Sequence, residues 1–349
     1  MSPTSCQLLH PAILECKGKK IVEYFNYFCK NIFKTTILSI YNLEDSSKTL
    51  HPTFTDNHKA GFISIIGKPN VGKSTLMNEL VGERLSIITS KAQTTRHRIM
   101  GIVNGELEGT PFQMVYSDTP GIIKPQYELH NSMMEFVRGS LADADVILFV
   151  TDIYEKFDEE DVIEKLKKTD VPVFLIINKV DLATPEKVEQ KTAHWKEVLN
   201  PTEILVISAL QGVGLGELLV KMIEYLPTHP PYFPKDELTD KPERFFAAEI
   251  IREKILQNYR KEIPYSCEIV ITEFKEKEDI VVVRAEIYVE RATQRAILLG
   301  HKGERIKKVG IEARESMEIF FQKKVFLEQY IKVEPDWRIK KDKLRRFGY

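Results

Sequence analysis

The eight residues Gly67-Lys68-Pro69-Asn70-Val71-Gly72-Lys73-Ser74 constrain the fold of this chain more than any other feature. They fit the pattern G-x-x-x-x-G-K-[ST], which holds phosphate groups where a strand passes into a helix. Here the apolar segment Gly61–Ile66 precedes the motif and the helix-like segment Thr75–Gly82 follows it. Its glycines let backbone N–H groups surround phosphate oxygens, and the helix N-terminus adds a favourable dipole. The motif therefore predicts a phosphate-binding loop in an α/β domain.

Two side chains of this loop have predicted roles in phosphate binding. Lys73 is expected to contact the β- and γ-phosphates, and Ser74 to ligate Mg²⁺. Asn70 is a candidate for holding a monovalent cation such as K⁺, with bracing of the loop as the alternative. The candidate phosphate-binding residues are Gly67, Lys68, Pro69, Asn70, Val71, Gly72, Lys73, Ser74 and Thr75.

Apolar segments alternate with helical patterns over residues 58–228. After Gly61–Ile66, strands are expected at Phe112–Ser117, Val146–Thr151, Val171–Asn178 and Glu203–Ser208. Strands separated by helices predict a mostly parallel sheet with helices on both faces. Such sheets bind ligands beyond the carboxyl ends of their strands, and the remaining motifs fall at those ends.

The strand Phe112–Ser117 ends in Asp118-Thr119-Pro120-Gly121. Asp118 is expected to hold Mg²⁺ through water, and the Gly121 N–H to contact a γ-phosphate. Alone, D-x-x-G is a common turn, but its place after a strand downstream of the phosphate loop favours a nucleotide site. Ile122 follows, where some GTPases have a water-orienting Gln, so slow turnover is expected unless a cation or a partner assists.

The motif Asn178-Lys179-Val180-Asp181 predicts which base is bound. The Asp181 carboxylate can accept two hydrogen bonds from guanine, whereas adenine has no donor there and would leave the charge unpaired. Lys179 can lie along the base, and Asn178 can brace the loop. Ser208-Ala209-Leu210 ends the next strand, where its N–H groups can meet the guanine O6. Together these motifs predict GTP or GDP rather than ATP as the ligand.

The polar, threonine-rich segment Ser86–Met100 is expected to be a loop that the γ-phosphate orders. Thr95 is the candidate second Mg²⁺ ligand, and Thr94 is the alternative. A flexible surface loop is the other interpretation of this segment. The candidate catalytic residues are Lys73, Thr95, Asp118 and Gly121, and the candidate Mg²⁺ ligands are Ser74 and Thr95.

A further α+β unit follows the proline-rich stretch Leu226–Pro234. Helices are expected at Phe245–Tyr259, Ala292–Leu299 and Glu304–Phe320, and strands at Ser266–Lys275, Ile280–Glu290 and Lys324–Val333. Gly300-His301-Lys302-Gly303 lies between two of these helices, as in a KH domain, whose G-x-x-G loop clamps single-stranded nucleic acid. A helix–turn–helix with two glycines is the alternative.

This G-x-x-G loop and its neighbours supply the candidate RNA-binding residues. They are Gly300, His301, Lys302, Gly303, Arg305, Lys307 and Lys308. Bases are expected on an apolar groove formed by Ile297, Leu298 and Ile306. The whole chain has a net charge of −1, which argues against a nucleic-acid partner, but residues 291–349 hold sixteen Lys or Arg against eight Asp or Glu. This local excess favours RNA, with a solvated helical face as the alternative.

The first 57 residues differ from the rest, because they contain no Arg and only one Gly. Ile21–Leu43 is a candidate amphipathic helix at a membrane surface. A poorly ordered leader, or a reading frame begun too far upstream, is the favoured interpretation. No secretory signal or apolar membrane span is indicated. The four cysteines lack zinc-ligand spacing, which indicates a reducing compartment and no disulfide framework.

Together these motifs resemble the Era family of bacterial GTPases over about residues 59–349. The specific matches are Lys91-Ala92-Gln93-Thr94-Thr95-Arg96-His97-Arg98, Ala247-Ala248-Glu249-Ile250-Ile251-Arg252-Glu253-Lys254, Lys324-Val325-Phe326-Leu327-Glu328 and Phe347-Gly348-Tyr349. The resemblance implies a cytoplasmic GTPase, with a peripheral pool on the inner membrane face, that binds the 3′ region of 16S rRNA and assists small-subunit assembly. It also implies that Thr95 is the switch-loop threonine and that GTP gates RNA binding.

The expected organisation is an N-terminal extension at 1–57, a GTPase domain at 58–228, a linker at 229–243 and a KH-type domain at 244–349. A monomer is expected. Three alternatives remain at this point: a membrane-associated GTPase without a primary RNA role, a GTPase acting on the large ribosomal subunit, and an inactive nucleotide-binding module.

Overall fold

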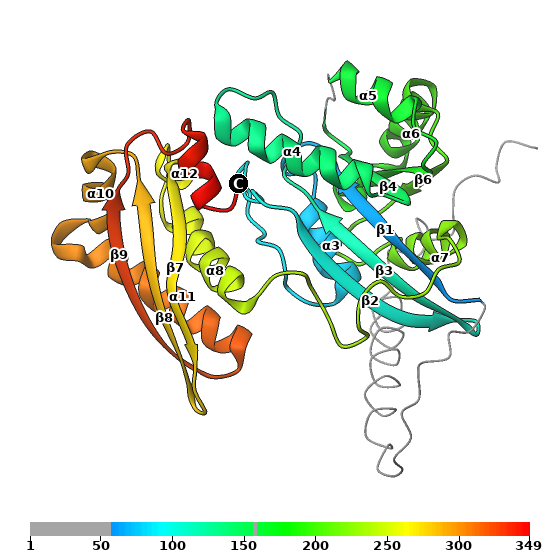
Figure 1. Cartoon of the computed structure of the whole chain (residues 1–349). Helices are drawn as coiled ribbons and strands as arrows, with labels where there is room; N and C mark the ends of the chain where they lie inside the picture. Colours follow the sequence, from blue (N-terminus) through cyan, green and yellow to red (C-terminus); the bar gives the residue numbers. More distant parts are fainter. Residues whose placement is uncertain (1–56, 156–158) are drawn as a thin grey trace, which may run out of the picture. The chain divides into compact units, whose positions relative to one another are not determined.

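The computed structural model describes residues 57–155 and 159–349. The candidate helix Ile21–Leu43 lies outside this part of the chain. The fold begins with a six-stranded sheet in the order β2-β3-β1-β4-β5-β6 (Figure 1). Its strands are β1 (Lys59–Ile66), β2 (Ile99–Leu107), β3 (Thr110–Asp118), β4 (Val146–Asp152), β5 (Val173–Asn178) and β6 (Glu203–Val206).

Five strands of this sheet run parallel. Strand β1 pairs in parallel with β3 and β4, and β5 with β4 and β6. Every residue of β5 is buried, and because successive side chains point to opposite faces, both faces of the sheet are covered. The predicted fold class and its five parallel strands are therefore confirmed.

Strand β2 at the sheet edge is a difference from the sequence analysis, which placed no strand there. It joins β3 through Glu108 and Gly109, both with positive φ (50° and 78°). Positive φ at two central residues is typical of the type I′ turn that connects antiparallel strands.

The helices of this α/β part are α3 (Lys73–Val81), α4 (Glu128–Ala142), α5 (Glu160–Lys167), α6 (Pro185–Leu199) and α7 (Leu215–Tyr225), with a short 3-10 helix η1 (Val180–Leu182). Helix α3 begins at Lys73, inside the phosphate-loop motif and two residues before the predicted start at Thr75. Gly72, in the left-handed region (φ 102°), marks its beginning, and Gly82 ends it in the same way (φ 80°).

The C-terminal α+β part contains a three-stranded sheet in the order β7-β8-β9. Strands β7 (Cys267–Glu276) and β8 (Ile280–Val289) are antiparallel, and β9 (Lys324–Val333) runs parallel to β8. Its helices are α8 (Glu243–Asn258), α9 (Ile263–Ser266), α10 (Ala292–Leu299), α11 (Glu304–Phe321) and α12 (Lys341–Arg346), with the 3-10 turn η2 (His301–Gly303). The expected α+β order is confirmed.

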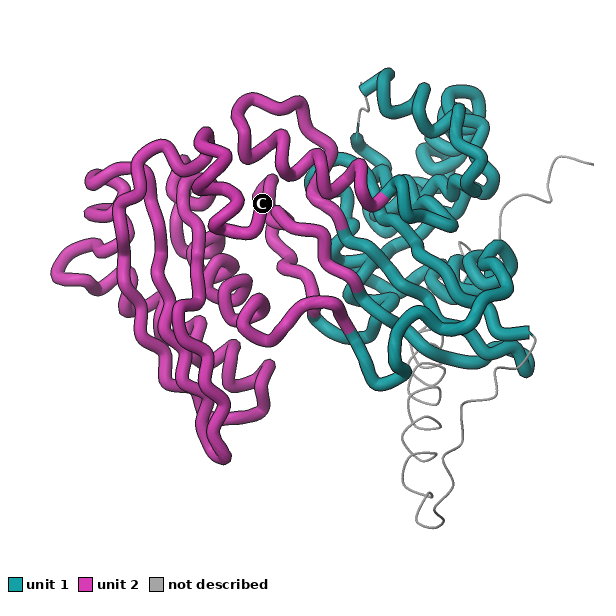
Figure 2. The backbone as a smooth tube through the Cα atoms, in the orientation of Figure 1, with its two compact units in different colours: residues 1–84, 101–118, 141–238 teal, residues 85–100, 119–140, 239–349 magenta. Residues whose placement is uncertain are grey.

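Contacts divide the chain into two compact units that do not follow the sequence order (Figure 2). Among the described residues, the first contains 57–84, 101–118, 141–155 and 159–238, and the second contains 85–100, 119–140 and 239–349. The loop before β2, and the segment after β3 with most of α4, therefore pack with the C-terminal α+β part. The core of that part includes Ile251, Ile255, Ala285, Leu298 and Val309, each without exposed surface.

His97 is a partly buried histidine of the second unit that lies among aromatic rings. Its ring stacks on Tyr349 at 4.4 Å between centroids, with Phe136 at 5.6 Å and Phe245 at 5.8 Å. Burial, and then the positive charges of Arg252, Lys241 and Arg96, lower the pKa of His97 to about 3. The folded protein therefore holds this histidine neutral.

The free energy of unfolding is expected to fall as pH drops from 6.5 to 3, because over this range the unfolded chain binds a proton at His97 that the folded chain does not. His97→Phe should flatten this acid dependence, measured by urea unfolding at stepped pH. His194→Phe changes an exposed histidine of α6 and serves as the control. If the free energy of unfolding fell equally with pH in the wild type and in His97→Phe, the His97 ring would not be held neutral in the folded protein.

Candidate functional site

The phosphate loop places two glycines where no side chain fits. A Cβ at Gly67 (φ 149°) would lie 2.1 Å from the Val150 carbonyl oxygen, and one at Gly72 (φ 102°) would lie 2.2 Å from Asn178 Nδ2. Asn70 also takes positive φ (66°). The backbone thus passes unusually close to its neighbours at both glycines, as expected of a loop whose N–H groups surround phosphate oxygens.

Lys73 brings a buried ammonium group to this loop. It exposes only 6% of its surface, and Nζ donates to the carbonyls of Gly67 (3.0 Å) and Lys68 (2.8 Å). Burial lowers the pKa of Lys73 to about 8, although Asp118 and Glu155 act in the opposite direction. An anionic phosphate beside Nζ would favour the charged form, so this environment fits a nucleotide phosphate.

Ser74 and Asp118 meet at the start of α3 and the end of β3. Ser74 Oγ donates to Asp118 Oδ2 at 2.7 Å, and Asp118 has no exposed surface. Hydroxyl and carboxylate oxygens are the hard ligands that Mg²⁺ prefers, directly or through water. This pair of oxygens therefore fits a Mg²⁺ ion beside the phosphates.

Asn178 joins three loops at the carboxyl edge of the sheet. Its Nδ2 donates to the Val71 carbonyl (2.9 Å), and its Oδ1 accepts from the N–H groups of Lys179 (2.8 Å) and Ala209 (3.0 Å). One amide thus fixes the phosphate loop, the Asn178–Asp181 loop and the Ser208–Leu210 loop relative to one another.

Lys179 and Asp181 border the region expected to hold the base. Lys179 has positive φ (63°), and its Nζ donates to the Asn70 carbonyl and Asp152 Oδ2, both at 2.7 Å. Ser208 Oγ donates to Asp181 Oδ1 at 2.6 Å, which orients the carboxylate. Leu210 is 74% exposed at the same edge. All motif residues of the first unit thus lie at neighbouring loops.

Asp152 is a polar residue of this edge that the sequence analysis missed. Burial alone would raise the pKa of its carboxyl group, but hydrogen bonds from Lys179 and from the N–H groups of Tyr154 and Glu155 bring that pKa below its usual range. The signal was present, because Asp152 ends β4 between the strands that carry the phosphate loop and the base motif.

The remaining predicted nucleotide residues belong to the second unit. Thr95 is buried in the loop before β2, and Thr119, Pro120, Gly121 and Ile122 follow β3 as buried residues. The Thr94 hydroxyl is engaged within its own loop, where it donates to the Lys91 carbonyl at 2.6 Å and lies 2.7 Å from Thr89 Oγ1. Thr95 is 8% exposed, and its assignment as the Mg²⁺ ligand in preference to Thr94 stays a prediction.

The G-x-x-G loop of the second unit forms the turn η2 between α10 and α11. Gly300 (φ 69°), Lys302 (φ 47°) and Gly303 (φ 80°) all take positive φ, and a Cβ at Gly303 would meet nothing within 4 Å. His301, Lys302 and Arg305 are exposed, as are Lys307 and Lys308 at the start of α11. The five predicted RNA-binding side chains other than the glycines are thus exposed, and four of them are basic Lys or Arg.

A groove of about 530 Å³ lies beside this loop, between α10, α11 and the edge strand β9. Its lining residues are Glu286, Arg295, Leu299, Ile306, Gln329, Tyr330, Ile331 and Lys332. The prediction for Leu298 was wrong, since it is fully buried in the core, and Ile297 is not part of the lining. Leu299, one residue further along α10, takes that place because each helical residue turns by about 100°.

Comparisons with known proteins support the predicted GTPase domain and the predicted KH domain. The family described as 50S ribosome-binding GTPase matches residues 62–179, and the KH domain family matches residues 262–338. A solved structure of Era with MgGDPNP and nucleotides 1506–1542 of 16S ribosomal RNA is 40% identical, with a TM-score of 0.79, and the match covers 84% of this chain and 99% of that one.

A second solved structure, an Era variant of Aquifex aeolicus bound to GDP·AlF4⁻, is also 40% identical. Its TM-score is 0.77, and the match covers 83% of this chain and 99% of that one. Both of these relatives match this chain across its two domains. They confirm the resemblance noted from the motifs, and the chain belongs to the Era family of GTPases.

Proposed function

We propose that this chain is a GTP-dependent switch that binds the 3′ region of 16S rRNA and assists assembly of the small ribosomal subunit. One observation carries the proposal: a guanine-nucleotide site and a KH groove occur in one chain that matches, at 40% identity, an Era protein solved with that RNA. The large-subunit alternative has less support, because the KH match covers residues 262–338.

Different residues bind the phosphates and the base of the nucleotide. The loop Gly67–Ser74 holds the phosphates, with Lys73 neutralising their charge, and Asp181 selects guanine. Bound Mg²⁺ would neutralise phosphate charge, and Ser74 and Asp118 would hold it directly or through water, with Thr95 as the ligand proposed from the loop before β2.

Hydrolysis has no evident water-orienting side chain in the motif after β3, where Ile122 is apolar and only 7% exposed. We propose slow intrinsic turnover that RNA or a monovalent cation accelerates. K⁺ near Asn70 is the candidate cation, since the loop carbonyls there are hard ligands.

RNA binding uses the groove beside η2. The exposed glycine loop can approach a sugar–phosphate backbone closely, while Leu299, Ile306 and Ile331 offer apolar contact to unstacked bases. Tyr330, half exposed on β9, supplies an aromatic ring. Arg295 and Lys332 add positive charge along the groove.

We also propose a monomer located in the cytoplasm, with a peripheral pool at the cytoplasmic face of the membrane. No helix among residues 57–155 and 159–349 is long and apolar enough to cross a membrane. Peripheral attachment is thus the form of membrane contact that we propose.

The test of the function is RNA binding by the full chain with a non-hydrolysable GTP analogue, GDP or no nucleotide. The RNA is the 3′ segment of 16S rRNA, with a scrambled RNA of equal length as the control. Selective binding that is tightest with the GTP analogue supports the proposal. Equal binding to both RNAs in every nucleotide state would sink it.

Reversing two charges at η2 is expected to weaken binding of the 16S segment by about tenfold or more at low salt, because each lost phosphate contact removes counterion release. The variant is Lys302→Glu with Arg305→Glu, and fluorescence anisotropy at stepped salt measures both affinity and salt slope. Lys165→Glu with Lys167→Glu makes the same charge change on exposed positions of α5. If the η2 variant binds the 16S segment as tightly as this control, the groove beside η2 is not the RNA-binding site.

A further inference from the structure

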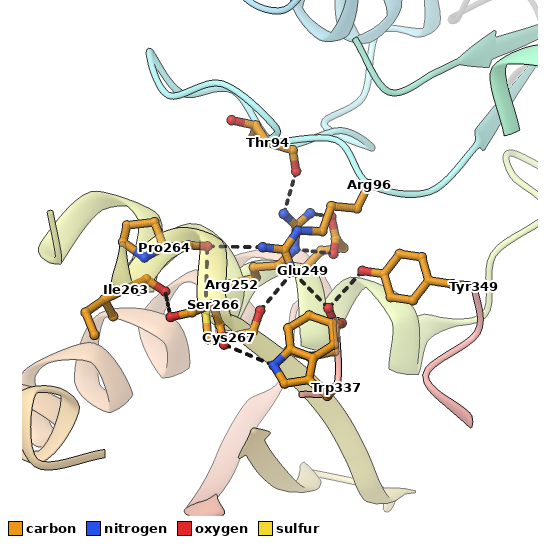
Figure 3. Close-up of polar contacts among 11 residues, drawn as sticks. Thr94, Arg96, Glu249, Arg252, Ile263, Pro264, Ser266, Cys267, Trp337 and Tyr349 are labelled. Carbon is orange, nitrogen blue, oxygen red and sulfur yellow. Dashed lines mark hydrogen bonds and ion pairs between the residues drawn. The ribbon is translucent and has the colours of Figure 1, made fainter. Parts of the chain in front are cut away.

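Arg96, in the loop before β2, is bound to the C-terminal α+β part. Its side chain is 1% exposed, and Nη1 donates to the Cys267 carbonyl (2.8 Å) and to Glu268 Oε2 (2.9 Å) (Figure 3). Nη2 donates to the Pro264 carbonyl at 3.2 Å. A desolvated guanidinium is stable only while these acceptors surround it, so the loop is firmly held at this point.

Three more hydrogen bonds, made by two side chains, hold the same loop. Arg252 of α8 is 2% exposed, forms an ion pair with Glu249, and donates through Nη1 to the Thr94 carbonyl (Figure 3). Lys91 Nζ donates to the carbonyls of Leu256 and Tyr259. The loop is therefore fixed at residues 91, 94 and 96.

The terminal residue, Tyr349, completes this network. Its hydroxyl donates to Glu268 Oε2 at 2.8 Å, the same oxygen that accepts from Arg96. Its ring stacks on His97, the next residue of the loop, at an interplanar angle of 22°. Tyr349 thus contacts the loop directly and, through Glu268, the residue that anchors it.

The C-terminal segment that carries Tyr349 also contacts the start of α4. The Arg338 carbonyl accepts from the Leu129 N–H at 2.9 Å, and Lys341 pairs with Glu128 at 3.2 Å. Trp337, fully buried, ties the segment to the end of α9 through a 3.1 Å bond from Nε1 to the Ser266 carbonyl. Residues 337–349 therefore contact both the loop before β2 and the first turn of α4.

These contacts constrain Thr95, the candidate Mg²⁺ ligand. Thr95 lies between Thr94 and Arg96, and consecutive Cα atoms are about 3.8 Å apart. Since both neighbours are bonded to α8, α9 or β7, a displacement of Thr95 either breaks those bonds or moves these elements with it. A change in the nucleotide-responsive loop is therefore transmitted to the KH-type part as long as Arg96 and its acceptors keep this arrangement.

We propose that Tyr349 is a positioning residue that couples the nucleotide state to RNA binding. Its hydroxyl orients Glu268 toward Arg96, so that the loop carrying Thr95 and the KH-type part change together when GTP replaces GDP. This coupling rests on the proposed function, because it regulates the RNA groove. By reciprocity, RNA binding then raises the affinity for GTP by the same factor.

Tyr349→Phe tests the coupling, because it keeps the ring on His97 and removes only the hydroxyl. The affinity of the full chain for the 16S segment is measured with a GTP analogue and with GDP. The wild-type ratio of the two affinities is expected to be about fivefold or more, and the variant ratio about twofold or less. Tyr225→Phe, which removes a hydroxyl 3.5 Å from Glu203 in the first unit, should keep the wild-type ratio.

Two outcomes would overturn the coupling: a wild-type ratio in Tyr349→Phe, or equal affinities with both nucleotides in the wild-type chain. Hydrogen exchange separates this failure from failure of the proposed function, since it needs no RNA. In the wild-type chain, exchange in residues 85–100 and 263–268 should both differ between GTP analogue and GDP. In Tyr349→Phe, only residues 85–100 should differ.

If the wild-type chain binds no RNA, the proposed function fails, and the exchange data still decide the coupling. A nucleotide-dependent change at residues 263–268 that persists in Tyr349→Phe would exclude the role of the hydroxyl. Thermal unfolding with GDP bound confirms that the compared variants are folded at the assay temperature.

Discussion

Lys73→Ala is expected to lower the affinity for GTP by about 100-fold or more. Removing one partner of a buried charge pair costs about 3 kcal/mol or more, and each 1.4 kcal/mol is about tenfold in affinity. Lys73 fits this case because it is 6% exposed and lies at the centre of the phosphate loop. Titration calorimetry with GTP and Mg²⁺ measures the loss, and Lys196→Ala on α6 is the matched control.

The lowered pKa of Lys73 gives this experiment a second readout. In the free protein its pKa is about 8, and a bound phosphate raises that pKa because it favours the charged form. GTP binding at pH 8 to 9 should therefore take up protons at Lys73, and affinity should fall as pH rises through this range. Buffers of different ionisation enthalpy report the uptake. Retained affinity and retained proton uptake in Lys73→Ala would show that another group holds the phosphates.

Local sequence patterns predicted most helices and strands, because the spacing of the apolar residues and the residues at the ends of each segment indicate the same type of element. The helix Ala292–Leu299 and the strand Lys324–Val333 were predicted with the observed bounds. Strand β2 was missed because Asn104, Gly105 and Glu106 interrupt its apolar pattern. Its partner explains it, since a Cβ at Gly105 would lie 2.6 Å from Phe112 Cζ, so this glycine leaves room for the ring of the adjacent strand.

The two parts of the candidate site differed in how much the sequence could predict. Loops at strand ends carry their chemistry in consecutive residues, so the phosphate and base motifs were identified directly. The bonds of Arg96 and Arg252 join residues more than 150 positions apart, and no local pattern specifies such pairs. For the same reason, the sequence could not assign residues 85–100 to the second compact unit.

The prediction for Leu298 was wrong for a similar reason, because the orientation of its helix depends on tertiary contacts. A helix of eight residues that ends in three consecutive large apolar side chains has an ambiguous phase. Packing of α10 against the sheet decides that Leu298 faces the core and Leu299 the groove. Only the tertiary contacts contain that information.

Asp181→Asn is expected to change the preferred base from guanine to xanthine. Guanine presents two donors, N1–H and the exocyclic amine, and the Asp181 carboxylate presents two acceptors. An asparagine presents one acceptor and one donor, which matches the N1–H and the C2 carbonyl of xanthine. GTP should lose about 100-fold or more in affinity, since a site built for two hydrogen bonds rejects a ligand that leaves polar groups unpaired.

Ser208 is expected to increase the change in preference from GTP to XTP. Its hydroxyl donates to Asp181 Oδ1 at 2.6 Å, and it can donate to the carbonyl oxygen of an asparagine at the same place. That bond would turn the amide nitrogen toward the base, where it opposes the guanine amine and pairs with the xanthine carbonyl. Competition of GTP and XTP for a fluorescent analogue measures the change, with Asp170→Asn at an exposed position as the control. Weaker GTP binding without a gain for XTP would mean that Asp181 supports the loop rather than the base, because only direct pairing depends on the donor pattern of the ligand.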